Sequence, residues 1–201
     1  MLCGTQARAM ERRSVRSVLY DGTELFGPTT ASALESTWDL LMEARLSSYY
    51  NGGSSSLSSN KDSEFILEEE MLSKHYIMYA GDAVVSSGRY HISPLPDGKV
   101  FVSIDRFGTL LPYRGKGYAK RGLKEIIASA LSQCGSSQNT VQAVVGIQAP
   151  TNMPPALADR LLRCGFVQTS EIPVVERGGV SYVTLVHRDW AILLDALSTI
   201  L

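Results

Sequence analysis

The chain has 201 residues and a formal net charge of -1, so it lacks the overall positive field that attracts nucleic acid or anionic membranes. Hydrophobic residues make up 44% and charged residues 19%, as in ordinary globular proteins, and no apolar run approaches the ~20 residues that cross a bilayer. We therefore expect neither a nucleic-acid nor a membrane partner, and an anionic ligand would need a local binding arrangement.

The cysteine and histidine patterns bear on metal binding and on the redox compartment. Cys3, Cys134 and Cys164 are widely spaced, no CxxC pair occurs, and the three histidines show no metal-ligand spacing. These observations argue against a disulfide framework and a zinc site. We expect no metal site and a cytoplasmic location, with an organelle transit peptide in the arginine-rich start, Arg8 to Arg16, as the alternative.

The beginning of the chain is interpreted as a disordered tail over residues 1–14, followed by a single domain over residues 15–201. Val15 to Tyr20 alternates loosely between apolar and polar residues and predicts a strand. Apolar residues at helical spacing predict a helix over about 30–46. Residues 47–63, rich in Ser, Gly and Asn, predict a flexible loop.

The middle of the chain combines a short helix with several strands. Phe65 to Met71, with three consecutive glutamates, predicts a short solvated helix. Two strands are predicted over His75 to Tyr90, around a Gly81-Asp82 turn, and Val100 to Asp105 alternates as a further strand. The one-sided apolar residues of Tyr118 to Gln133 predict a helix.

The last third continues this alternation of strands and helices. The apolar run Val141 to Ile147 predicts a strand at the centre of a covered sheet. A helix is predicted from Pro155 to Cys164, followed by two strands over Phe166 to Val175 and Val180 to His187. A terminal helix capped by Asp189 follows. The pattern predicts an α/β fold with a mixed sheet.

The most informative segment is the glycine-rich turn before the helix at Tyr118. Gly115 and Gly117 let the backbone approach a ligand, and the first helical N–H groups lack internal partners. With the helix dipole and the charges of Arg114 and Lys120, this predicts a pyrophosphate site. The GxxxxGK[ST] loop is missing, and Lys120 stands where the Rossmann pattern needs a third small residue. The alternative is a tight turn with a solvated basic face.

Arg114 to Ala119, RGKGYA, resembles the motif [QR]xxGx[GA] of the GNAT superfamily of N-acetyltransferases. As in that family, a strand ending in Leu110-Leu111-Pro112 precedes the motif. Ala83 to Arg89 resembles the family's preceding strand, and Val144 to Phe166 resembles its second half, with an apolar strand, an Asn, a short helix and a Gly-Phe step. The resemblance covers roughly residues 38–187.

The resemblance implies a GNAT-like fold, with a mixed, mostly antiparallel central sheet that contains a splayed pair of parallel strands and is flanked by helices. It implies acetyl-coenzyme A (acetyl-CoA) as co-substrate and no metal. Main-chain groups at the splayed strand and an asparagine would bind pantetheine, and the glycine turn would bind the pyrophosphate. The amide of Leu110 or Leu111 would also polarise the thioester carbonyl. The residues implied to bind the co-substrate are Leu110, Leu111, Arg114, Gly115, Lys116, Gly117, Tyr118, Ala119, Lys120 and Asn152.

The implied mechanism is direct attack of a neutral amine on the thioester. Asp105 is the candidate base, and the alternative is a salt-bridged or solvated strand residue. Many family members carry a tyrosine as general acid four residues before the Gly-Phe step, where this chain has Leu161. Tyr118 is the candidate acid, with Tyr113 and Cys164 as alternatives. A thiolate with a pKa near ~8.5 can also leave without an acid.

The implied activity is transfer of an acetyl group from acetyl-CoA to a primary amine of a small molecule or a protein. Leu161 suggests the alternative of a catalytically silent acyl-CoA-binding sensor or interaction domain, and a scaffold that binds no CoA is a third interpretation. Arg89 either binds an acidic acceptor or pairs with Glu68 to Glu70. The apolar segment from Trp190 to Leu201 either packs on its own domain or forms a homodimer face.

Overall fold

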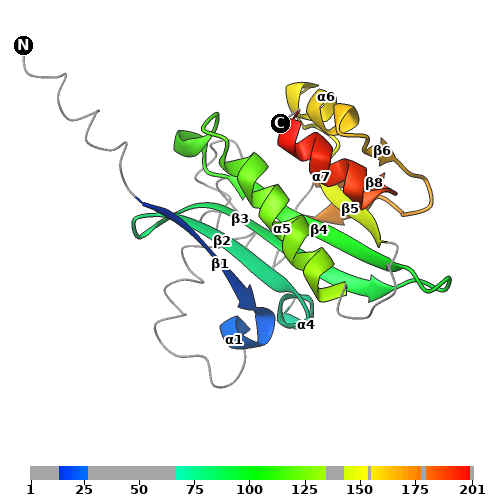
Figure 1. The fold of residues 1–201 in the computed structure, drawn as a ribbon, viewed down its shortest axis with the longest axis horizontal. Helices are drawn as coiled ribbons and strands as arrows, with labels where there is room; N and C mark the ends of the chain where they lie inside the picture. Colours follow the sequence, from blue (N-terminus) through cyan, green and yellow to red (C-terminus); the bar gives the residue numbers. More distant parts are fainter. Residues whose placement is uncertain (1–13, 27–66, 135–142, 154, 178–179, 200–201) are drawn as a thin grey trace, which may run out of the picture.

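An eight-stranded mixed sheet forms the centre of the molecule (Figure 1). The computed structural model describes residues 14–26, 67–134, 143–153, 155–177 and 180–199, so the helix predicted over about 30–46 and the loop predicted over 47–63 lie outside it. The strands are β1 (Val15–Asp21), β2 (Lys74–Ala80), β3 (Ala83–Pro94), β4 (Val100–Thr109), β5 (Ala143–Pro150), β6 (Val167–Gln168), β7 (Val175–Arg177) and β8 (Val180–His187). Their order is β1-β2-β3-β4-β5-β8-β6, with β7 also paired to β8.

Helix α5 (Tyr118–Cys134) lies across β2, β3 and β4 and is the main cover of one sheet face (Figure 1). Its apolar and small residues recur at helical spacing, so one side of the helix packs on the sheet while the other meets solvent. The residues buried in this way are Gly122, Leu123, Ile126, Ile127 and Ala130. The helix predicted over Tyr118 to Gln133 is thereby confirmed.

The C-terminal helix α7 (Trp190–Thr199) packs against α5 and β5. It begins where Oδ1 of Asp189 accepts the N–H groups of Ala191 (3.0 Å) and Ile192 (3.1 Å), which confirms the predicted cap. The remaining helical segments are α1 (Gly22–Phe26), α4 (Leu67–Met71), α6 (Pro155–Arg163) and the 3-10 turn η2 (Leu111–Tyr113). Within the described ranges, no helix combines the length and the apolar character needed to cross a membrane.

The parallel strands β4 and β5 pair along only part of their length. Their register runs from Val100 opposite Ala143 to Ile104 opposite Ile147, and no later pair joins them in the described residues. All other neighbouring strands of the sheet are antiparallel. This arrangement confirms the mixed, mostly antiparallel sheet with a splayed parallel pair.

A β-bulge in β4 accounts for the place where the two strands part. On β3, Ser87 and Arg89 are two residues apart, whereas their partners Gly108 and Asp105 on β4 are three residues apart. The extra residue falls at Arg106, whose φ of 51° lies in the left-handed region. A bulge bends and twists its own strand, so β4 stays paired with β3 while it turns away from β5.

Gly88, on β3 opposite the bulge, keeps the space that the displaced side chain of Phe107 needs. A Cβ at Gly88 would lie 2.7 Å from Cδ2 of Phe107 and 2.8 Å from Cδ1 of Ile126, much closer than carbon atoms can approach. The missing side chain therefore lets Phe107 pack between the sheet and α5. The position of the bulge, and with it the parting of the strands, is set by this local packing.

The strand predicted over Phe166 to Val175 is broken into the short strands β6 and β7. The hydroxyl Oγ1 of Thr169 accepts the N–H of Glu171 (3.1 Å), a local turn that competes with a strand ladder. Pro173, two residues further on, has no N–H to give to a neighbouring strand. The alternation of apolar residues alone did not reveal these two interruptions.

Candidate functional site

A cleft of about 460 Å³ opens beyond the last pair that joins β4 and β5. Its walls come from the end of β4, the glycine turn with the first residues of α5, the end of β5, and α6. The lining residues are Phe107, Thr109, Tyr113, Arg114, Gly115, Gly117, Tyr118, Ala119, Lys120, Leu123, Ile147, Gln148, Ala149, Pro150, Leu157, Arg160 and Leu161.

The glycine turn presents its main chain to this cleft. Gly115 and Gly117 have φ values of 77° and 80°, and a Cβ at either would have no heavy atom within 4 Å. The carbonyl of Gly117 accepts the N–H of Arg121 (3.0 Å), so the N–H groups of residues 118–120 precede the first helical hydrogen bond. The first turn of α5 contains no acidic residue to offset the positive end of the helix dipole.

Among the described residues, those that line the cleft with a charged side chain are all cations. Arg114, Lys120 and Arg160 line it, and no described aspartate or glutamate does. Nε of Arg114 donates to the carbonyl oxygen of Thr109 (2.9 Å), which anchors this side chain at the end of β4. Together with the open end of α5, these cations make the cleft suited to an anion, and phosphate groups bind readily in such surroundings.

This chain resembles known proteins in structure rather than in sequence. Neither the protein-family models nor the curated proteins include a sequence match. Among solved structures, an acyl-CoA N-acyltransferase from Pseudomonas aeruginosa matches with a TM-score of 0.56 and 12% identity, over 87% of this chain and 99% of that chain. An acetyltransferase assigned to the GNAT family, from Desulfovibrio desulfuricans, matches with a TM-score of 0.54 and 11% identity over the same shares.

This chain has the GNAT fold. A chain of the NatC complex bound to Gag peptide and CoA also matches, with a TM-score of 0.53 and 11% identity over 88% of this chain and 99% of that chain. The splayed strands, the glycine turn and the helix behind it are the parts of the GNAT fold that build the cleft described above.

Most of the glycine-turn residues predicted to bind the co-substrate line the cleft of the GNAT fold. These are Arg114, Gly115, Gly117, Tyr118, Ala119 and Lys120. Lys116 does not line it, and Nζ of Lys116 lies 5.7 Å from the ring centre of Tyr113. Asn152 is exposed in the turn after β5 and does not line the cleft either.

Both main-chain groups of Leu110 and the carbonyl of Leu111 are engaged inside the protein. The N–H of Leu110 donates to the carbonyl of Val85 (3.0 Å), and its carbonyl accepts the N–H of Tyr113 (2.9 Å). The carbonyl of Leu111 accepts the N–H of Arg114 (3.2 Å). Neither leucine lines the cleft, whereas Phe107 and Thr109 do. The segment of β4 that lines the cleft, at Phe107 and Thr109, therefore lies just before Leu110 and Leu111, the two residues that were predicted to do so.

Sequence reasoning missed the far wall of the cleft. The sequence predicted the helix from Pro155 to Cys164, but it did not single out Leu157 or Arg160 on that helix, or the segment Ile147 to Pro150 at the end of β5. The amphipathic pattern of α6 marks which of its residues face inward, yet it gives no reason to choose Arg160 over Arg163. Only the packing of α6 beside the cleft distinguishes these two arginines.

Two tyrosines are the phenolic side chains that line the cleft. Tyr113 and Tyr118 have ring centres 6.4 Å apart. Leu161, at the position where many GNAT members carry a tyrosine, also lines the cleft and is 6% exposed. Cys164 does not line it, and burial, only partly opposed by the charge of Lys120, raises the pKa of its thiol. Of the three candidate acids, Tyr113 and Tyr118 therefore line the cleft and Cys164 does not.

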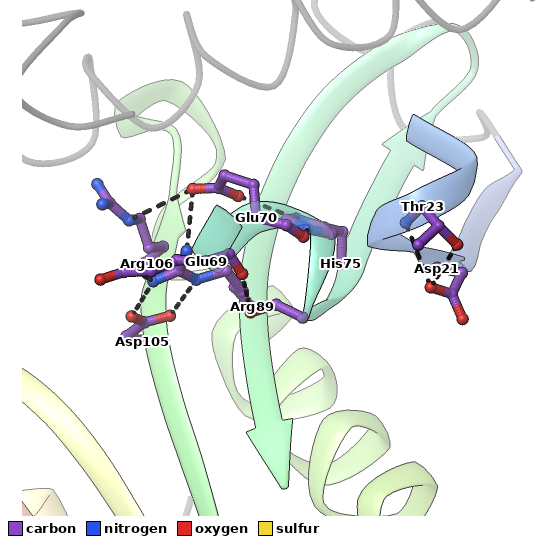
Figure 2. Close-up of polar contacts among 9 residues, drawn as sticks. Asp21, Thr23, Glu69, Glu70, His75, Arg89, Asp105 and Arg106 are labelled. Atoms are coloured by element: carbon purple, nitrogen blue, oxygen red, sulfur yellow. Dashed lines mark hydrogen bonds and ion pairs between the residues drawn. The ribbon is translucent and has the colours of Figure 1, made fainter. Parts of the chain in front are cut away.

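Asp105 belongs to a buried ion-pair network on the face of the sheet opposite to α5 (Figure 2). Nε of Arg89 donates to Oδ1 of Asp105 (2.7 Å), and Nη2 donates to Oδ2 of the same carboxylate. Nη1 of Arg89 donates to Oε1 of Glu70 (3.0 Å), and Nη2 also donates to Oε2 of Glu69 (3.1 Å). The alternative that Arg89 pairs with Glu68 to Glu70 is thereby confirmed for Glu69 and Glu70.

The strand register explains why this network forms. His75, Arg89 and Asp105 are successive partners across β2, β3 and β4, so their side chains share one face. The neighbouring Tyr90 points to the opposite face, where its hydroxyl lies 3.1 Å from Oγ of Ser129 on α5. Glu70 is fully buried against this row, with Oε2 3.5 Å from Nδ1 of His75.

The network has two consequences for the predicted site. The segment α4 was predicted to be solvated, and this is wrong for Glu70, because the arginine on β3 draws its carboxylate into the protein. Burial alone would lower the pKa of Arg89, but the hydrogen bonds and charges of Asp105, Glu70 and Glu69 outweigh it and raise the pKa. Asp105 does not line the cleft and forms an ion pair with Arg89. This placement agrees with the alternative interpretation of Asp105 as a salt-bridged strand residue.

Proposed function

We propose that the protein binds acetyl-CoA in the cleft between β4 and β5 and transfers the acetyl group to a primary amine. The observation that carries this proposal is the open glycine turn at the start of α5, facing a cleft whose charged lining is entirely cationic. The cleft also lies between parted parallel strands, as in the GNAT fold. The matching NatC chain, which was solved with CoA, supports the same ligand.

The residues of the cleft fit the parts of CoA. The N–H groups of residues 118–120 and the guanidinium of Arg114 would hold the diphosphate. The absence of any heavy atom near a Cβ at Gly115 or Gly117 leaves the main chain accessible to a bulky phosphate. The unpaired edge of β4 near Phe107 and Thr109 would accept the amide groups of the pantetheine arm as an added strand.

When bound, acetyl-CoA supplies an activated acetyl group that a neutral amine takes with loss of a proton and release of the CoA thiol. The hydroxyls of Tyr118 and Tyr113 are the groups of this chain that would donate a proton to the departing sulfur. None of the described residues that line the cleft carries a carboxylate, and water would carry the amine proton away. Leu161 would present an apolar side chain to the cleft and exclude water from that side of it.

The experiment that tests this function combines cofactor binding with turnover. We expect CoA to raise the melting temperature, and we expect free thiol to appear when acetyl-CoA is mixed with a diverse panel of primary amines and short peptides. Stabilisation by CoA with no thiol release across the panel would instead support the catalytically silent sensor. An unchanged melting temperature at saturating CoA would reject the proposal.

Asp105→Asn separates the catalytic role of Asp105 from a structural one. Because this side chain holds Arg89 and does not line the cleft, we expect about 1–3 kcal/mol of lost folding stability in chemical denaturation and turnover within a few-fold of the unchanged protein. Asp97→Asn, which changes a carboxylate in the exposed turn between β3 and β4, is the control. Unchanged stability together with lost turnover would restore Asp105 as the base.

A further inference from the structure

We propose that Arg160 recognises a second phosphate group of the ligand, the phosphate monoester on the ribose of CoA, and so makes the protein distinguish CoA from its 3′-dephospho form. The inference rests on the proposed function and deepens it. Arg160 lines the cleft from α6, a different element from the glycine turn and the start of α5, which also line it. A ligand whose diphosphate lies at the start of α5 would thus meet Arg160 with a different part of its structure.

The charge of Arg160 is not neutralised within its own helix. The single acidic residue of α6 is Asp159, whose Oδ2 lies 3.1 Å from Nη2 of Arg163. No carboxylate in the described part of the chain forms an ion pair with Arg160, although this residue lines a cleft in which only cations are charged. A guanidinium in that setting attracts a doubly charged phosphate monoester and binds it through two parallel hydrogen bonds.

The division of tasks within the cleft supports the same conclusion. The main-chain N–H groups of residues 118–120 and the anchored side chain of Arg114 would bind the diphosphate. Lys120 and Arg160 add two further positive charges to the lining of the same cleft.

Arg163 provides a matched control on the same helix. It is an arginine one turn from Arg160, but its side chain is 70% exposed, pairs with Asp159 and does not line the cleft. We would measure dissociation constants of CoA and of 3′-dephospho-CoA by calorimetry for the unchanged protein, Arg160→Gln and Arg163→Gln. Both substitutions remove one positive charge from an exposed position of α6, so both variants are expected to fold.

We expect the unchanged protein to prefer CoA by about five- to tenfold, the size of one well-placed but solvent-accessible ionic contact. Arg160→Gln should reduce this preference to about twofold or less, mainly by weakening CoA, whereas Arg163→Gln should retain it. Equal affinity of the unchanged protein for both ligands, or equal weakening of both by Arg160→Gln, would overturn the inference while leaving the proposed function intact. Failure of the unchanged protein to bind CoA would overturn both.

Discussion

Gly117→Asp is expected to weaken CoA binding by about 100-fold or more while the protein stays folded. A side chain at this position would enter open space at the mouth of the cleft, so no packed atom has to move. The carboxylate would, however, stand at the positive end of α5 and repel the diphosphate. The φ of 80° adds a modest backbone cost, which Asp tolerates better than most residues. Calorimetric titration with CoA measures the loss directly.

Gly98→Asp is the control for this substitution. Gly98 has a similar φ of 77° and equally open surroundings, but it lies in the turn between β3 and β4 and does not line the cleft. The backbone cost and the added charge are therefore matched, and only the location differs. We expect CoA affinity within about twofold of the unchanged protein. Comparable losses in the two variants, or full affinity in Gly117→Asp, would contradict the proposed binding site.

Arg89→Met is expected to lower the free energy of unfolding by about 3–5 kcal/mol, because it removes the arginine that both buried carboxylates, Glu70 and Asp105, contact. The side chain of Arg89 is 4% exposed, and those of Glu70 and Asp105 are 0% and 10% exposed, so water cannot replace the lost partner. Urea denaturation followed by circular dichroism gives the difference.

Arg188→Met removes an arginine from a solvent-exposed ion pair and serves as the comparison. Nη2 of Arg188 lies 3.3 Å from Oε2 of Glu171, and both side chains are more than half exposed. Such pairs contribute about 0–1 kcal/mol, so the midpoint of unfolding should hardly move. If the two variants lost similar stability, the buried network would not be the strong tertiary constraint that its geometry indicates.

Much of the fold could be predicted because several segments carry periodic or turn signals of their own. Short stretches of sequence determine the apolar face of α5, the turn at Gly81-Asp82 and the cap at Asp189. Such local signals suffice to place a helix or a strand. The break between β6 and β7 was missed because one hydroxyl and one proline interrupted an otherwise apolar stretch.

The site was predictable in its glycine turn and not in its far wall. Gly115 and Gly117 are informative by themselves, since both adopt positive φ values beside an open space. Arg160 and Gln148 come together with that turn only through the packing of α6 and the end of β5, which no local pattern encodes. The burial of Glu70 depended likewise on a partner 19 residues away, Arg89.

The short contact between β4 and β5 joins the two halves of the sheet, β1 to β4 and β5 to β8, through few main-chain hydrogen bonds. Five residue pairs, from Val100 with Ala143 to Ile104 with Ile147, form the only ladder across it in the described residues. Helix α7 bridges the two halves of the sheet, because it contacts both α5 and β5. In addition, Nζ of Lys124 on α5 donates to Oγ of Ser198 on α7 (2.8 Å). A torsion between the half-sheets would widen or narrow the cleft with few broken hydrogen bonds, and the C-terminal helix sets the stiffness of that torsion.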